Sequence, residues 1–223
     1  MKQAKGLVES EKFYRLEEAV ALLKKAPQPK FDQSVEISIR LNLDLKEKVQ
    51  PVRGTVILPH GTGKIVKLAV FCKEKDAKAA KDAGADYIGD ADLIKKVNDG
   101  FLDFNMAIAT PEMMKDLAKL GRILGPRGLM PTPKAGTVTN DIVYAIKEAK
   151  KGKIEFKMDK SACINMAVSK ISFDEKAICE NLKALIQAVR QNKPPHIKGQ
   201  FIKSITLSTT MGPGVKLDSS EYK

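Results

Sequence analysis

Aromatic side chains are scarce in this sequence. Phe, Tyr and Trp make up 5% of the 223 residues, and tryptophan is absent. Proteins that bind single-stranded nucleic acids without sequence preference stack successive bases on aromatic side chains. A stacking platform of that kind is therefore not expected.

Cysteine and histidine are also rare, which argues against several kinds of catalytic and metal site. The cysteines, at positions 72, 163 and 179, lie far apart and lack the CxxC spacing of a zinc site. We interpret them as reduced packing residues. The two histidines, His60 and His196, lie beside Pro or Gly and have no triad partner at a known spacing. Both are expected in surface loops.

Nucleotide-binding glycine motifs are missing as well. The segment HGTGK at 60–64 lacks the GxxxxGK(S/T) spacing of a phosphate loop, and Ile65 stands where a magnesium-binding hydroxyl is needed. No GxGxxG follows the buried apolar segments in the middle of the chain. The sequence therefore predicts no cofactor, no metal and no catalytic residue.

Long apolar runs are absent too. No segment approaches the roughly 18 consecutive apolar residues of a membrane span, and residues 1–12 contain no apolar core of a signal peptide. We therefore expect no membrane association and a cytoplasmic location.

Positive charge, by contrast, is abundant. Lys and Arg number 39 against 27 Asp and Glu, for a net charge of +12. Such a surplus attracts polyanions by releasing their counterions, and on charge alone RNA, DNA and an anionic membrane surface all qualify. Composition alone leaves a soluble basic enzyme open as the alternative.

The N-terminal part of the chain predicts a helix followed by a half-buried strand. Residues 15–26 carry apolar side chains at helical spacing, and Pro27 and Pro29 prevent the helix from continuing. Apolar and polar residues then alternate over 35–43 without a fault, which is typical of a strand with one buried face.

The C-terminal part returns to the same style. A strand over 163–171, an amphipathic helix over 174–191 and a strand over 200–210 are expected. In the last strand we place Ile202 on one face with Ser204, Thr206 and Ser208, and Phe201, Ile205 and Leu207 on the other.

The middle of the chain has a different pattern. VKLAVFC and NMAIAT are nearly continuous apolar runs that alternate with helical segments, as in a doubly wound parallel sheet. We expect an α/β protein in which a domain of residues 67–159 is inserted into a domain of residues 1–66 and 160–223; two sequential domains are the alternative. The outer segments carry 22 basic and 13 acidic residues, the middle 17 and 14, which favours the outer domain as the polyanion platform.

Two glycine-rich segments are candidates for contact with nucleic acid. Residues 120–138, LGRILGPRGLMPTPKAGTV, interleave Gly and Pro with three cations and contain no acidic residue. Bare backbone and cations suit phosphate, although a rigid connector is an equally good interpretation. Residues 208–218 place three hydroxyls and Met211 before a Gly-Pro-Gly turn, which can expose hydroxyls and amides to ribose 2′-OH groups; a simple hairpin turn is the alternative.

Taken together, these segments resemble the family of ribosomal large-subunit protein one over nearly the whole chain. The resemblance rests on KFDQSVEI from Lys30, VRGTVILPHGTGK from Val52, AGADYIGDADLI from Ala83, LGRILGPRGLMPTPKAGTVT from Leu120, KIEFKMDK from Lys153 and STTMGPGVKL from Ser208. It implies a split ferredoxin-like domain that holds both termini, and an inserted Rossmann-like domain that binds no dinucleotide.

The resemblance also implies a function and a site. A structural, non-enzymatic protein of the large subunit is expected, which binds ribosomal RNA at the mobile stalk, assists release of exit-site tRNA, and represses translation by binding its own messenger RNA. Its terminal domain makes the RNA contacts, which by match of motif fall on Phe31, Glu36, Ser204, Thr210, Met211 and Gly212. Lys30 and Lys170 are added as phosphate partners because of their charge.

Other expectations follow from the same resemblance. The protein is expected to be a monomer off the ribosome, in the cytoplasm or in an organellar stroma or matrix. Ser208 and Gly214 depart from the threonine and serine common in relatives, which affects the fine contacts of the last motif.

Two other functions compete with an RNA-binding ribosomal protein. A Rossmann-type enzyme would need a glycine-rich turn after VKLAVFC, where Lys73, Glu74 and Lys75 stand. A free-standing messenger-RNA repressor is a second rival.

Overall fold

The computed structural model describes residues 8–9, 12–43, 51–194 and 199–218 of the chain, so His196 lies outside the described residues. The chain divides into two compact units. One contains residues 1–63 and 152–223 and is called here the split unit; the other contains residues 64–151 and is called the inserted unit.

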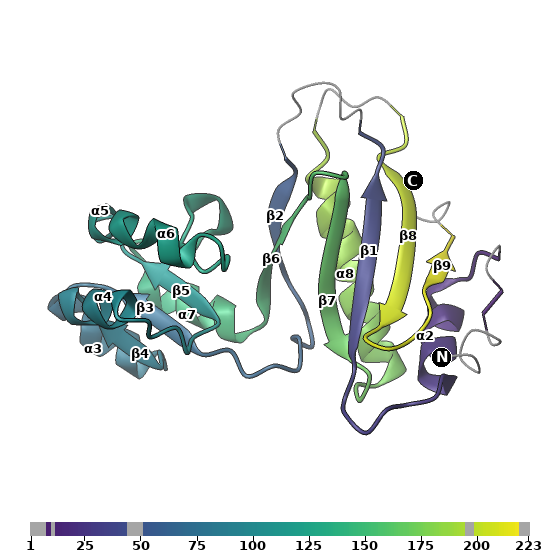
Figure 1. Cartoon of the computed structure of the whole chain (residues 1–223), viewed down its shortest axis with the longest axis horizontal. Coiled ribbons are helices and arrows are strands. Elements are labelled where there is room, and N and C mark those ends of the chain that lie inside the picture. Colours follow the sequence, from purple (N-terminus) through teal and green to yellow (C-terminus); the bar gives the residue numbers. More distant parts are fainter. Residues whose placement is uncertain (1–7, 10–11, 44–50, 195–198, 219–223) are drawn as a thin grey trace. The chain divides into compact units, whose positions relative to one another are not determined.

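The described residues of the split unit form a four-stranded antiparallel sheet, a two-stranded ribbon and two helices (Figure 1). Its elements are α2 (Leu16–Lys25), β1 (Ser34–Leu41), β2 (Arg53–Ile57), β6 (Lys153–Lys157), β7 (Cys163–Lys170), α8 (Glu175–Gln191), β8 (Ile202–Thr209) and β9 (Val215–Leu217).

The larger sheet has the order β7-β1-β8-β9, with β1 antiparallel to both of its neighbours. Strands β7 and β8 are therefore parallel to each other, joined by α8 and separated by β1, which is the split βαβ arrangement of ferredoxin-like folds. Both α2 and α8 contribute buried residues to the core under this sheet.

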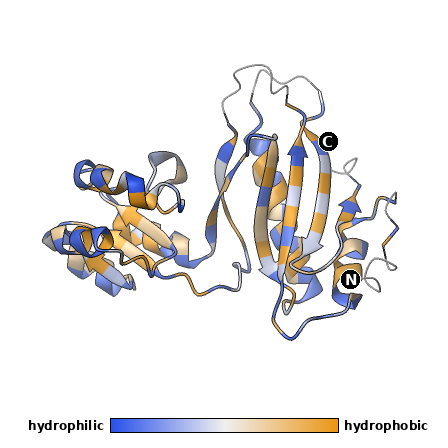
Figure 2. Ribbon diagram, viewed as in Figure 1, coloured by the Kyte–Doolittle hydropathy of each residue, from blue (hydrophilic) through white to orange (hydrophobic). Residues whose placement is uncertain are grey.

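Alternation of apolar and polar residues decides which face of the sheet is buried. In β1, Val35, Ile37, Ile39 and Leu41 are at most 2% exposed, whereas the polar residues between them are exposed. Figure 2 shows this alternation as bands along β1 and β8. The polar face of the sheet is thus left open.

Ile202 corrects the expected pattern of β8. The sequence places it with Ser204 on the polar face, but its side chain is 2% exposed and belongs to the core. The register shifts between Arg40 and Leu41 of β1, so Ile202 pairs with Leu41. This irregularity in the ladder lets both Ile202 and Ile205 face the helices.

The observed unit boundaries differ from the expected ones because of the ribbon. Strand β6, which the sequence assigns to the inserted domain, pairs antiparallel with β2 from Arg53↔Lys157 to Ile57↔Lys153. Buried Phe156 joins the core of the split unit. The split unit therefore resumes at Gly152, and its first part ends at Gly63.

The inserted unit has a three-stranded parallel sheet with the order β4-β3-β5. Its elements are β3 (Leu68–Phe71), α3 (Glu74–Asp82), β4 (Tyr87–Gly89), α4 (Ala91–Asn98), β5 (Met106–Ala109), α5 (Met114–Leu117), η1 (Ala118–Leu120), α6 (Gly121–Leu124), η2 (Pro133–Ala135) and α7 (Ile142–Lys150).

Both faces of this parallel sheet are covered. Successive residues of β3 alternate between two core clusters, with Ala69 and Phe71 in one and Leu68 and Val70 in the other. All four are 0% exposed, as the continuous apolar run predicts. The expected α/β class, with an antiparallel and a parallel sheet in two units, is confirmed.

The cysteines are free, and two of them are buried. Burial raises the pKa of the Cys72 and Cys179 thiols, which keeps both in the neutral form. Cys72 lies in a core cluster of the inserted unit and Cys179 in that of the split unit. These positions suit packing residues.

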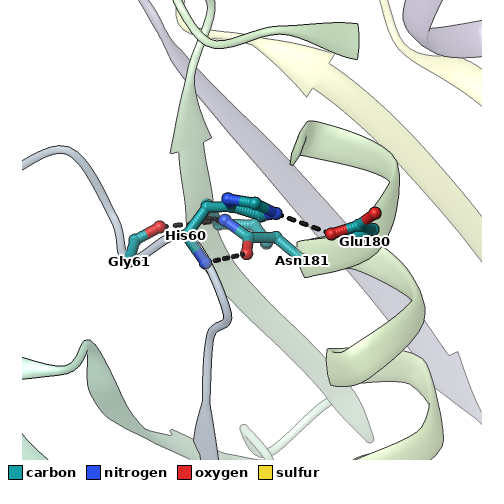
Figure 3. Close-up of polar contacts among 5 residues, drawn as sticks. His60, Gly61, Glu180 and Asn181 are labelled. Carbon is teal, nitrogen blue, oxygen red and sulfur yellow. Dashed lines mark hydrogen bonds and ion pairs between the residues drawn. The ribbon is translucent and has the colours of Figure 1, made fainter. Parts of the chain in front are cut away.

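The loop after β2, at His60 and Gly61, is held by hydrogen bonds to α8 (Figure 3). Asn181, which is 0% exposed, accepts a hydrogen bond from His60 N (3.1 Å) and donates to the carbonyls of Gly61 (2.9 Å) and Val168 (3.2 Å). His60 Nε2 also lies 2.6 Å from Glu180 Oε2. The histidine is thus part of a structural anchor.

We predict that Asn181→Ala lowers the free energy of unfolding by about 1–3 kcal/mol, because the buried groups around it lose their partner. Chemical denaturation measures the change. Asn192→Ala is the matched control: the Asn192 residue is exposed and its side chain bonds Ala188 O, which lies one helical turn before it, so a change below about 0.5 kcal/mol is expected. Equal effects of the two substitutions would contradict the anchor.

Candidate nucleic-acid interface

The open face of the four-stranded sheet is polar and lined by small side chains. Glu36, Ser38 and Arg40 of β1 are exposed on it. Across β8 they face Ser208, Thr206 and Ser204, and across β7 they face Ala167, Asn165 and Cys163. Ser38 Oγ and Asn165 Oδ1 are 2.6 Å apart. The face offers hydroxyls, an amide and charged groups over three adjacent strands.

At one end of this face, the start of β1 and the end of β8 are tied together around Thr210. Thr210 N donates to Ser34 O (3.2 Å), and Ser34 N donates to Thr210 Oγ1 (3.1 Å). Thr210 Oγ1 also donates to Ser34 O over a long distance of 3.5 Å. A bond of this length is weak, so an outside acceptor can replace it.

A buried glutamine extends this end of the sheet to Met211. Gln33 is 2% exposed, and its Oε1 accepts a hydrogen bond from Met211 N (2.9 Å). Met211 and Phe31 are 53% and 51% exposed, so both offer apolar surface to a ligand. They stand on segments fixed by Gln33, and such groups can pack against sugars or bases.

Gly212 closes the turn under close packing. Its N–H donates to Thr209 O (3.0 Å), and an added Cβ would collide with Thr209 Oγ1. That hydroxyl is buried and makes no hydrogen bond within the described part of the chain. Glycine is therefore required here by the space around it, and the backbone stays bare.

The two lysines proposed as phosphate partners have different surroundings. Lys170 Nζ donates to Asp32 O (3.1 Å) and to Ser34 Oγ (3.2 Å), so it stabilises the loop as well as adding charge. Ser172 binds the Asp32 carboxylate through its N–H and its hydroxyl. Lys30 is exposed on the same loop.

Seven of the eight expected site residues thus gather at this end of the sheet. Ser204 is the exception: it lies on the same open face, but six residues before Thr210, about 20 Å along the strand at 3.3 Å per residue. It pairs with Arg40. A ligand that contacts both ends must cover most of the sheet.

Sequence reasoning missed the residues that hold this site together. Gln33, Ser34 and Asp32 lie inside the motif KFDQSVEI but were not selected. A polar residue just before an alternating strand was the only available signal. Their partners across the sheet are 136–178 positions away in the chain, so the pairing itself was not visible.

The inserted unit has one other candidate site. A cavity of about 680 Å³ lies at the carboxyl ends of its parallel strands, lined by Lys73, Lys75, Asp76, Asp90, Thr110, Glu112 and Asn140. Lys73 and Glu112 form a 2.6 Å ion pair, which lowers the pKa of Glu112. The lining of the cavity has two lysines and three carboxylates, so it has no positive surplus that would favour a polyanion. No group of residues suited to a metal ion was found among the described residues.

Comparisons with known proteins show which family this chain belongs to. The profile of the ribosomal protein L1p/L10e family matches residues 22–213. The large ribosomal subunit protein uL1 of Aster yellows witches'-broom phytoplasma is 54% identical over 93% of this chain and 90% of its own length. The same protein of Chlamydia caviae is 49% identical over 99% and 96%, and that of Protochlamydia amoebophila 51% over 98% and 92%.

This chain belongs to the ribosomal protein L1p/L10e family. The expected family resemblance is confirmed, and with it the expectation of a structural, non-enzymatic ribosomal protein. The alternative that this chain is a Rossmann-type enzyme is therefore wrong. Among the described residues, no helix is long and apolar enough to cross a membrane.

We predict that Gly212→Ala lowers the free energy of unfolding by about 1–3 kcal/mol, because the new methyl group overpacks against Thr209 Oγ1. In a Thr209→Ala background the same substitution should cost clearly less, since the colliding hydroxyl is gone. Thermal or urea unfolding of the parent, the two single variants and the double variant forms the test. An unchanged cost in both backgrounds would show that the contact does not constrain Gly212.

Proposed function

We propose that this member of the family is a constituent of the large ribosomal subunit that binds structured ribosomal RNA through the split unit. Ribosomal RNA is the partner that family membership implies. The observation that carries the residue-level proposal is the joint presentation of Thr210, Met211 and Phe31 by segments bonded to each other at one end of an open polar sheet.

The chemistry of this end suits RNA. The Thr210 hydroxyl exchanges its long bond to Ser34 O (3.5 Å) for one to a ribose 2′-OH, a group that distinguishes RNA from DNA. Glu36 on the open face accepts hydrogen bonds from base amino groups or 2′-OH groups. Phe31 and Met211 pack against sugars or bases, while Lys30 and Lys170 neutralise phosphates. Ser204 and Gly212 complete the set proposed from the sequence.

Charge supports the choice of unit. With the observed boundaries, the split unit carries 23 basic and 15 acidic residues, the inserted unit 16 and 12. The excess of +8 on the split unit attracts RNA by counterion release. Most of the protein's positive surplus thus accompanies the proposed site.

We also propose a position on the ribosome and a regulatory role, both of which use the same site. We place the protein at the mobile stalk of the large subunit, where it assists release of exit-site tRNA, and we expect a monomer off the ribosome. Its own messenger RNA, folded like the ribosomal site, would compete for the same surface and so repress translation. Cosedimentation with large subunits distinguishes the ribosomal protein from a free-standing repressor.

We predict that Thr210→Val lowers the affinity for a large-subunit ribosomal RNA fragment about tenfold, roughly 1.4 kcal/mol. The loss should be similar at low and high salt, because it removes a short-range hydrogen bond and no charge. Filter binding across a salt series measures it, beside a thermal melt that confirms folding.

Two variants control this experiment. Thr210→Ser keeps the hydroxyl and should retain most of the affinity, whereas Lys30→Ala should reduce the dependence of affinity on salt by about one phosphate contact. If Thr210→Val binds like the parent at every salt concentration, the proposed hydrogen bond to RNA does not exist.

A second prediction concerns the split unit alone. Leu58 N donates to Gly152 O (3.2 Å), and a Cβ at Gly152 would lie 2.7 Å from Gly61 Cα, so a short glycine linker can join residue 63 to residue 152. The joined chain should fold and bind the ribosomal RNA fragment within about tenfold of the whole protein. A folded chain that loses about a hundredfold or more, roughly 2.7 kcal/mol, would move the site to the inserted unit.

A further inference from the structure

The inserted unit has an uneven distribution of charge. Residues 117–140 contain four basic residues and no acidic one, and the remaining part of the unit contains twelve of each. The whole positive surplus of the inserted unit therefore comes from one segment of 24 residues. The proposed RNA site on the split unit does not include this segment.

A helical run leads into this segment, with one apolar face and an exposed face that carries three cations and Asp116. Helix α5, the turn η1 and helix α6 follow each other without a gap from Met114 to Leu124. Leu117, Leu120 and Leu124 are at most 2% exposed and anchor the run in the core. Lys115, Lys119 and Arg122 are spaced by four and three residues, and all are exposed on the opposite side.

A hydrogen-bonded turn then fixes the position of Arg127. Leu129 N donates to Leu124 O (3.0 Å), and Gly128 N donates to Gly125 O (3.0 Å), with φ of 70° at Gly128. These two bonds and the left-handed glycine form a Schellman motif, in which Leu129 packs beside Leu124. Arg127 is exposed on this rigid turn.

Gly121 has no packing reason to be glycine. Its backbone is helical, with φ of −54°, and an added Cβ would meet nothing within 4 Å. Glycine inside a helix is less stable than alanine, so the fold alone would favour a larger residue. A bare backbone beside exposed Arg122 suits the close approach of a ligand's backbone.

The cations are differently placed for binding. Lys119 Nζ lies 3.1 Å from Asp116 Oδ1, which partly neutralises it. Within the described residues, no ion pair is found for Arg122 or Arg127. Planar guanidinium groups bind phosphate with two parallel hydrogen bonds, so these two arginines are the strongest candidates for phosphate contacts.

We propose that Arg122, Arg127 and the bare backbone at Gly121 form a second RNA-binding surface, which binds the phosphate backbone of an RNA segment distinct from the one on the sheet. The surface contacts phosphate groups and makes no base-specific contacts. It goes beyond the proposed function, because it gives the inserted unit an RNA contact of its own and does not require the site at Thr210.

The test uses the full-length protein with two RNAs: a 20-base-pair RNA duplex of arbitrary sequence and the large-subunit ribosomal RNA fragment. Arg122→Ala with Arg127→Ala is compared with Lys95→Ala with Lys96→Ala, which removes the same charge from exposed residues on α4 of the same unit. Affinity is measured across a salt series, and thermal melts confirm that each variant is folded.

Replacing both arginines with alanine should weaken binding of the duplex. It should also lower the slope of log affinity against log salt by nearly two, at about 0.9 per lost phosphate contact. The lysine pair should leave the slope near that of the parent. Gly121→Ala should raise the melting temperature yet weaken duplex binding severalfold, an outcome that a purely structural glycine cannot give.

Other outcomes would overturn the proposal. Equal losses from the arginine and lysine pairs would mean that only net charge matters, and no loss from either pair would mean that no contact exists. A larger loss toward polyglutamate than toward the duplex would assign the surface to an acidic protein. Thr210→Val should act on the ribosomal fragment and spare the duplex, so failure at one site is distinguishable from failure at the other.

Discussion

The pairing of β1 with strands on both of its sides is the constraint on which the split unit depends. β1 is completed only by β7 and β8, which follow it by more than 120 residues, after the chain has passed through the inserted unit. Closing so long a loop costs entropy, and burial of Val35, Ile37 and Ile39 against α2 and α8 offsets that cost. The same pairing brings the two ends of the chain into one sheet and leaves its polar face open.

The candidate site is a consequence of that pairing. Because β1 begins where β7 and β8 end, the loop at 30–34 meets Lys170 on one side and the turn at 210–212 on the other. Gln33 is buried between them, and its side-chain Oε1 fixes Met211 by accepting a hydrogen bond from Met211 N. Polar groups held in this way need little reordering when RNA binds, so less of the binding free energy is lost to entropy. The inserted unit differs, because both faces of its parallel sheet are covered. Its exposed arginines therefore lie on helices and turns.

Much of the fold could be predicted from periodicity. The alternation over 35–43 gave β1 and its buried face, and the apolar runs gave β3 and β5, because side-chain burial in these strands follows local sequence. The three-residue strands β4 and β9 were missed because so short a segment has no period to detect. The placement of β6 depended on its partner β2, and the burial of Ile202 on a shift in register, neither of which is local information.

For the site, the sequence by itself determined the chemistry: a basic chain without catalytic or cofactor motifs, and specific segments around Phe31, Thr210 and Met211 that indicate the family. It could not determine which of these residues meet. Only the tertiary structure joins Ser34 to Thr210 and Gln33 to Met211. The physical reason is that a residue's chemical character is fixed by its own side chain, whereas a hydrogen bond between residues 176 or more positions apart exists only when the packing of the core has set the register of the strands that carry them.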